Sequence, residues 1–131
     1  MKLPIQLSKD SREPIYHQIE NQLKALIAGG HLASDTPLPS IRALAKDLET
    51  SVITIRRAYQ DLENQGFIRT TQGKGTFVAE IDQSLKQQVK ISSVYQSMEN
   101  AVETAFNYDY TYSQIEDIFH EVIDTHKREG K

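Results

Sequence analysis

Two short helical segments followed at once by a β-hairpin occupy residues 40–79, and this order constrains the fold more than any other feature of the sequence. Ser40 and Ser51 are of a type that caps helices, and each precedes a short apolar stripe at helical spacing. After Gly66, two alternating segments flank Gln72-Gly73-Lys74-Gly75, a pattern typical of a hairpin. The two stripes are Ile41, Leu44, Ala45 and Leu48, then Ile55, Ala58, Tyr59 and Leu62. We therefore predict a winged helix-turn-helix, in a fold that is mainly α with a small β-hairpin.

Apolar residues at helical spacing also occur before residues 40–79. Residues 1–13 lack periodicity, and we expect them to form an extended lead-in. A helix is predicted to follow from Pro14, which suits a first helical turn, with Asp10 or Ser11 upstream as its cap. Gly29-Gly30 is expected to end that helix.

A long helical pattern follows the hairpin. From Asp82 the apolar residues keep helical spacing for about 25 residues, and Asn107-Tyr108-Asp109-Tyr110 interrupts them. A last helix follows, for which Ser113 and Glu116 form the expected capping box. One short helix cannot cover the long apolar stripe, so we predict that the tail helices of two copies pack into a small bundle. The residues predicted to make this dimer contact are Leu85, Val94, Met98, Val102, Phe106, Ile115, Phe119 and Val122.

Composition excludes several classes of protein. The chain has no Cys, which excludes disulfides and thiolate metal sites and fits the cytoplasm, where we expect the protein to reside. No apolar run approaches the roughly 20 residues of a membrane span, so we expect no membrane partner. The formal charge of -3 argues against a non-specific nucleic-acid coat. No nucleophile elbow, phosphate-binding loop or His/Cys metal set is present, so we predict no enzyme activity, no metal and no cofactor.

Charge is unevenly distributed, and one helix carries a face suited to DNA. Residues 1–80 hold ten basic and nine acidic residues, whereas residues 81–131 hold five and nine. The face of the third helix opposite its apolar stripe shows Val52, Ile53, Thr54, Arg56, Arg57 and Gln60, with no acid until Asp61. We expect the nearby acids to fall at other helical phases than the arginines. Arg and Gln can hydrogen-bond base edges, although ordinary surface charge also accounts for such a distribution.

Five ordered motifs closely resemble the DNA-binding domain of GntR-type bacterial transcriptional regulators. They are Glu13-Pro14-Ile15-Tyr16-His17-Gln18-Ile19, Leu38-Pro39-Ser40-Ile41-Arg42-Ala43-Leu44-Ala45, Thr54-Ile55-Arg56-Arg57-Ala58-Tyr59-Gln60-Asp61-Leu62-Glu63, Gly66-Phe67-Ile68 and Gly73-Lys74-Gly75-Thr76-Phe77-Val78. The resemblance covers roughly residues 10–80, which we expect to form a GntR-type winged helix-turn-helix domain. Residues 81–131, expected to be a two-helix dimerisation tail, resemble the YtrA subfamily. The resemblance implies a homodimeric repressor that binds double-stranded DNA at a palindromic operator, in its own operon.

The resemblance also implies DNA contacts at matching positions. These positions are Arg42 in the second helix, Ser51, Thr54 and Arg56 in the recognition helix, and Gln72, Gly73 and Lys74 at the hairpin tip. Val52 departs from the pattern, because many members have an arginine there. The operator then differs, or Val52 contacts a thymine methyl group instead. We also include Ile53 and Arg57 among the expected contacts.

Two other functions remain open from the sequence. One is an architectural or plasmid-maintenance winged-helix protein, which the acidic tail disfavours because such proteins bind through strong non-specific charge. The other is a winged-helix protein-interaction module, which the arginine-bearing face disfavours. An unidentified small-molecule effector is a further expected partner, and the two tail helices offer little room for it except at a dimer seam.

Overall fold

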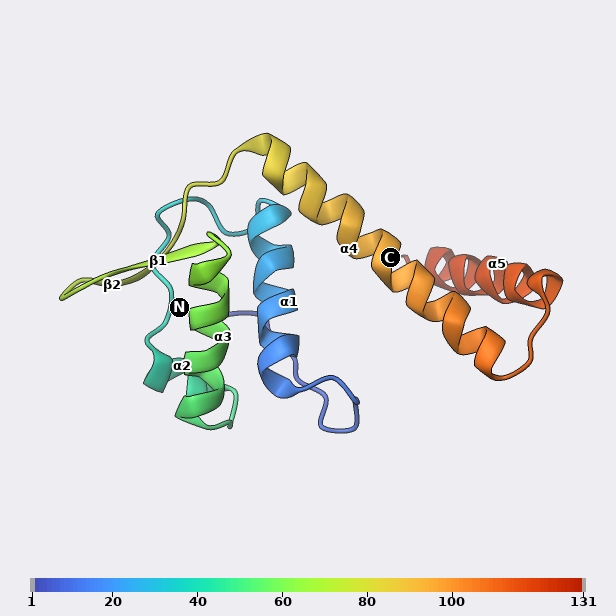
Figure 1. The fold of residues 1–131 in the computed structure, drawn as a ribbon, viewed down its shortest axis with the longest axis horizontal. Helices are drawn as coiled ribbons and strands as arrows, with labels where there is room; N and C mark the ends of the chain where they lie inside the picture. Colours follow the sequence, from blue (N-terminus) through green and yellow to red (C-terminus); the bar gives the residue numbers. More distant parts are fainter. Residues whose placement is uncertain (1, 131) are drawn as a thin grey trace. The chain divides into compact units, whose positions relative to one another are not determined.

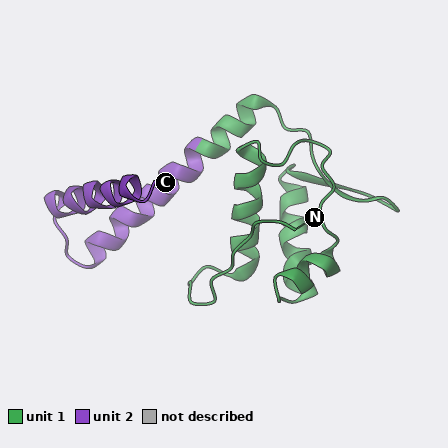
Figure 2. Ribbon diagram, turned by 180° about the vertical axis from the view of Figure 1, so that it is seen from behind, with its two compact units in different colours: residues 1–90 green, residues 91–131 purple. Residues whose placement is uncertain are grey.

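The computed structural model describes residues 2–130 and divides into two compact units, residues 1–90 and residues 91–131 (Figure 2). The elements are α1 (Ile15–Ala28), α2 (Ile41–Asp47), α3 (Val52–Asn64), β1 (Ile68–Thr71), β2 (Gly75–Val78), α4 (Gln83–Asn107) and α5 (Tyr112–Arg128). The predicted fold, mainly α with a small hairpin in a winged helix-turn-helix, is confirmed. Among the described residues, none of the helices combines the length and the apolar composition that a bilayer crossing requires.

The core of residues 1–90 forms where three helices and the hairpin meet. Helices α1 and α3 lie side by side, and α2 packs against α3 (Figure 1). The most deeply buried large side chains come from all of these elements, namely Ile19, Leu23, Ile27, Leu44, Ile55, Leu62 and Val78. Because α3 lies at the centre of this core, one face of that helix is fixed and the opposite face remains available.

Both predicted serine caps are confirmed. Ser40 Oγ accepts a hydrogen bond from the Ala43 N–H at 3.1 Å, and Ser51 Oγ accepts one from the Thr54 N–H at 3.1 Å. At the end of α3, Gly66 adopts a φ of 86°, which lets the chain turn directly into β1. Ser40 therefore sets the start of α2, and Ser51 and Gly66 define the bounds of α3.

Two other predicted caps are wrong. At α5 the capping box is formed by Thr111 and Gln114 rather than by Ser113 and Glu116. The helix begins at Tyr112, so Ser113 already lies inside its first turn, and the Thr-x-x-Gln pattern two residues earlier satisfies the same rule. At α1 neither Asp10 nor Ser11 caps the helix: the N-cap is Pro14, and no side chain caps it.

The hairpin pairs antiparallel, with Ile68 opposite Val78 and Thr71 opposite Gly75. Its turn is closed by a hydrogen bond from the Lys74 N–H to the Thr71 carbonyl at 3.0 Å, with Gly73 at a φ of 80°. The loop at residues 35–38 adds backbone hydrogen bonds along the other edge of β2. We call this β1–β2 hairpin the wing, and it projects away from the helices in Figure 1.

The N-terminal segment is extended, as expected, and it is also tightly packed. Leu3 and Ile5 are buried in the core. Gln18 on α1 donates to the carbonyls of Ser8 and Glu13 and accepts from the Ser8 N–H. A second glutamine one turn later, Gln22, makes the same pair of bonds with Gln6. The two glutamines thus give the extended segment backbone partners of the kind that a sheet edge provides.

Residues 91–131 comprise the rest of α4, a short turn and α5. The two helices meet at the turn, where the rings of Phe106 and Tyr112 make an edge contact at 5.1 Å. Neither α4 nor α5 has a buried residue. Of the residues predicted for dimerisation, Ile115 is half-buried, and Leu85, Val94, Met98, Val102, Phe106, Phe119 and Val122 are exposed.

Candidate nucleic-acid interface

Helix α3 has one face in the core and one in solvent. Ile55, Ala58, Tyr59 and Leu62 are buried, as the sequence predicted. Ile53, Arg56 and Gln60 are exposed at positions three and four residues apart, so they form one row along the outer face of the helix. We call this row the outer stripe. The sequence placed Gln60 on this face, although Gln60 was not included in the final set of expected DNA contacts.

The first turn of α3 assigns different tasks to adjacent side chains. Ser51 Oγ and Thr54 Oγ1 lie 2.8 Å apart, so the two hydroxyls are hydrogen-bonded to each other while Ser51 caps the helix. Val52 is half-buried and packs against the core. Ile53 has 76% of its surface exposed. In the first turn, the apolar side chain of Ile53 therefore faces solvent, whereas the neighbouring hydroxyls of Ser51 and Thr54 already have hydrogen-bond partners.

Arg57 lies one helical turn from Ile53, beside the outer stripe, but it has partners within the domain. Its guanidinium carbon is 4.0 Å from the ring centre of Tyr16 on α1, and its Nε is 3.8 Å from a carboxylate oxygen of Asp61. The expectation that no acid shares a helical phase with an arginine is therefore wrong, since Arg57 and Asp61 are one turn apart. A DNA contact by Arg57 stays a prediction.

The orientation of α2 against α3 is fixed by a partly buried hydrogen bond and a tight turn. The Tyr59 hydroxyl donates to the Pro39 carbonyl at 2.7 Å, next to the N-cap of α2. Burial raises the pKa of Tyr59 above its ordinary value, so this hydroxyl stays protonated as a donor. Between the helices Glu49 adopts a φ of 53°, a left-handed conformation in which side chains are strained. Arg42 is exposed in the first turn of α2.

The wing tip presents a cation, Lys74, on a tight turn that contains Gly73. Gln72, Gly73 and Lys74 are all exposed, and Gly73 leaves room for the backbone to approach a sugar-phosphate chain. Arg69 serves the wing in another way: its Nη2 donates to Asp35 at 2.7 Å, and its guanidinium lies 4.9 Å from the centre of the Phe77 ring. Arg69 therefore braces the hairpin, while Lys74 remains available for a phosphate.

A buried carboxyl group, which no sequence pattern predicted, lies where α1 packs against α3. Glu20 on α1 is 4% exposed, and its Oε1 has no hydrogen-bond partner within residues 2–130. Desolvation raises the pKa of Glu20 from 4.5 to about 7; the Asp61 side chain, by hydrogen bonding and charge, also raises it, while Lys24 and Arg57 lower it. Glu20 therefore binds its proton more tightly at the α1–α3 contact than a carboxyl in water does.

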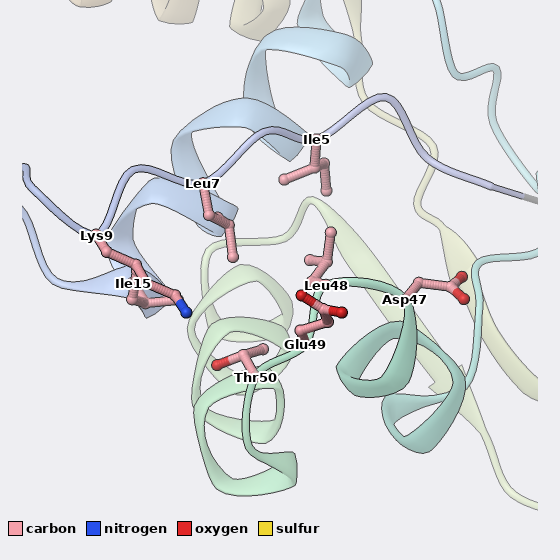
Figure 3. Close-up of a pocket in the computed structure, with 8 residues that line it drawn as sticks. All are labelled: Ile5, Leu7, Lys9, Ile15, Asp47, Leu48, Glu49 and Thr50. Carbon is pink, nitrogen blue, oxygen red and sulfur yellow. The ribbon is translucent and has the colours of Figure 1, made fainter.

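A hollow of about 480 Å³ lies between the N-terminal segment and the turn that precedes α3 (Figure 3). In Figure 3 the side chains of Ile5 and Leu7 point toward Leu48 across it. The remaining lining residues are Lys9, Ile15, Asp47, Glu49 and Thr50. Within the described part of the chain, no cluster of three or more His, Cys, Asp and Glu side chains is arranged to hold a metal ion.

Comparison with known sequences gives a consistent group of relatives. Residues 15–78 match the family model described as bacterial regulatory proteins, gntR family. The transcriptional repressor YtrA of Bacillus subtilis is 32% identical over 98 residues, which are 75% of this chain and 75% of YtrA. The repressor NagR of Bacillus subtilis is 44% identical over 73 residues, which are 56% of this chain and 30% of NagR. The chain thus spans less than a third of NagR. These relatives are named as transcriptional regulators and not as enzymes.

Solved structures agree with the sequence relatives. A GntR family transcriptional regulator from Listeria monocytogenes superposes with a TM-score of 0.69 at 29% identity, over 86% of this chain and 97% of that one. YtrA from Sulfolobus acidocaldarius gives a TM-score of 0.56 at 35% identity, over 70% of this chain and 97% of that one. The DNA-binding domain of AraR, solved in complex with operator ORE1, gives 0.50 at 32% identity, over 59% and 94%.

Proposed function

Because the chain belongs to the GntR family of bacterial regulatory proteins and to its YtrA subfamily, we propose that it is a transcriptional repressor that binds operator DNA. The observation that carries this proposal is the outer stripe of α3, where Ile53, Arg56 and Gln60 face solvent on a helix fixed by its buried side. A recognition helix of this kind enters the major groove. The similarity to the AraR domain that was solved with an operator supports the same proposal.

The proposed contacts divide into base recognition and phosphate binding. Arg56 is exposed and has no partner among the described residues, so its guanidinium can hydrogen-bond a guanine edge in the major groove. Arg42 and Lys74 are exposed cations at the start of α2 and at the wing tip, where contacts to phosphates orient the domain. The remaining proposed contact positions are Ser51, Val52, Ile53, Thr54, Arg57, Gln72 and Gly73.

Titration of labelled operator DNA across a salt series tests this division. Arg56→Ala is expected to cost about 1–3 kcal/mol of operator affinity and to relax sequence preference. Lys74→Ala is expected to weaken binding to all sequences similarly and to reduce the salt slope by about one. Arg12→Ala removes an exposed arginine outside the proposed interface and is the matched control. Unchanged operator affinity in both interface variants would refute the assignment of this face.

We propose that the protein acts as a homodimer through residues 91–131 and the neighbouring part of α4. Support comes from the apolar side chains of α4 and α5 that are exposed to solvent. Among them, Val94, Met98 and Val102 are four residues apart and so share one face of α4. Apolar patches of this kind mark interfaces. A two-fold dimer presents two recognition helices, which fits an inverted-repeat operator. We further propose that the dimer acts in the cytoplasm and represses transcription of the operon that contains its own gene.

Single charges on α4 test the dimer. Met98→Asp places a carboxylate in the proposed contact and is expected to give monomers with much weaker operator binding, because an unpaired buried charge opposes association. Ser93→Asp, on the opposite side of the same helix, is the matched control and should stay dimeric. Sedimentation, circular dichroism and operator binding are measured on one sample. A Met98→Asp protein that remains dimeric would place the contact elsewhere.

The hollow beside the α2–α3 turn is where we propose that a small-molecule effector binds. Its volume of about 480 Å³ falls within the range of ligand sites. Leu48, Glu49 and Thr50 line it and lead directly into the N-cap of α3, so an occupant would act on the residues that position the recognition helix. Operator titrations with cell metabolites, repeated on Leu48→Ala, test this part of the proposal.

The two alternative functions make different predictions about DNA. An architectural protein would bind all duplexes with similar affinity, and a protein-interaction module would bind none. A footprint confined to an inverted repeat upstream of the protein's own gene would exclude both.

A further inference from the structure

Ile53 is exceptional among the apolar side chains of residues 2–84. Of the large hydrophobic side chains in residues 2–84, Ile53 is the one that remains exposed, with 76% of its surface in solvent. The other large apolar side chains there are buried or half-buried. Folding of residues 1–90 therefore does not account for an isoleucine at this position.

The neighbours of Ile53 are committed to the fold. The hydroxyls of Ser51 and Thr54 are hydrogen-bonded to each other, and Ser51 Oγ also accepts from the Thr54 N–H. Val52 packs against the core. In the first turn of α3, Ile53 is thus the side chain that extends furthest into solvent without a structural task. An apolar group on a helix that enters the major groove has one apolar partner there, the C5-methyl group of thymine.

We propose that Ile53 determines operator specificity by packing against a thymine methyl group, and that Val52 does not take this role. The inference rests on the proposed DNA binding by α3. Ile53 and Arg56 are three residues apart, which is about 4.5 Å along the helix axis, whereas successive base pairs are about 3.4 Å apart. Each half-site should therefore contain a thymine one or two base pairs from the base pair that Arg56 contacts.

Replacement of thymine by deoxyuridine isolates this contact, because it removes the methyl group and keeps base pairing. The full-length protein is first used to select its preferred duplex from a random-sequence library. Each thymine of the selected site is then replaced in turn, in both half-sites, and affinities are measured by fluorescence anisotropy for wild type, Ile53→Ala and Val52→Ala. Circular dichroism verifies that the variants are folded.

For wild type, we expect one thymine position per half-site at which deoxyuridine weakens binding about three- to fivefold for each methyl group lost, in line with burial of one methyl group. Ile53→Ala should bind the thymine and deoxyuridine duplexes equally at that position, whereas Val52→Ala should still distinguish them. Equal binding of all substituted duplexes by wild type would overturn the inference while leaving DNA binding intact. Discrimination that persists in Ile53→Ala, or that is lost in Val52→Ala, would assign the methyl contact to another residue. Failure to select any duplex would overturn the proposed function as well.

Discussion

The buried carboxyl of Glu20 should make the stability of the protein depend on pH. Its pKa is raised from 4.5 to about 7 in the folded chain, mainly by desolvation. A carboxyl whose pKa is raised by folding binds its proton more tightly in the folded state, so its contribution to stability is fully present below pH 4.5 and is lost as the pH rises through 7. The raised pKa corresponds to roughly 2–3 kcal/mol of unfolding free energy lost between pH 4.5 and pH 8.

Glu20→Gln removes the titration and keeps the shape of the side chain. The amide is neutral at every pH, so the variant should resemble wild type at pH 5 and should be about 2–3 kcal/mol more stable at pH 8. Urea unfolding of the full chain at pH 5, 6, 7 and 8, followed by circular dichroism and tyrosine fluorescence at one protein concentration, measures the difference. Glu80→Gln changes an exposed glutamate and is the matched control.

Two results of the comparison between Glu20→Gln and wild type would refute the predicted pH dependence. If the difference in unfolding free energy between Glu20→Gln and wild type does not change from pH 5 to pH 8, folding does not raise the pKa of Glu20 and the reasoning is refuted. A variant that is less stable than wild type at pH 8 would contradict the reasoning more directly, because it would mean that the charged form of Glu20 is favoured at the α1–α3 contact.

Three further substitutions test individual hydrogen bonds and the strained turn within residues 1–90. Tyr59→Phe leaves the Pro39 carbonyl without its donor and should cost about 1–2 kcal/mol of unfolding free energy, whereas Tyr95→Phe, at an exposed tyrosine, should cost almost nothing; thermal unfolding compares the two. Gln18→Ala removes three hydrogen bonds to the N-terminal segment and should cost roughly 2–4 kcal/mol, with faster amide hydrogen exchange in residues 3–8. Glu49→Gly relieves the left-handed backbone in the α2–α3 turn and should stabilise the chain by roughly 0.5–1 kcal/mol in urea unfolding, since glycine also costs chain entropy.

Features set by local signals could be predicted from the sequence. Ser40 and Ser51 cap their helices because an N-cap needs only its own side chain and an N–H three residues on. The wing was predictable for a similar reason, since Gly73 and the alternating strands specify a tight turn. Even the error at α5 is local, because two overlapping capping patterns compete and the position of the first helical residue decides between them.

Features that depend on distant partners could not be predicted. The N-terminal segment is buried because Gln18 and Gln22 on α1 supply its backbone with hydrogen bonds, and nothing in the segment itself indicates those partners. The alternation of Leu3, Ile5 and Leu7 nevertheless indicated that one side of the segment is buried.

The ion pair between Arg57 and Asp61 could have been predicted, because the two residues are four positions apart on one helix.

The distribution of charge connects the proposed dimer with the proposed recognition of DNA. Residues 1–90 carry 12 basic and 10 acidic side chains, whereas residues 91–131 carry three and eight. One DNA-binding unit therefore has few cations to offer to phosphates, among them Arg42 and Lys74 at the proposed interface, so its non-specific affinity should be low. Two units joined through their tails double the number of phosphate contacts and require both half-sites to be present in the correct spacing. We therefore expect specific DNA binding to need both base recognition by the outer stripe and association of the tails. Loss of either should abolish regulation even when the winged domain remains folded.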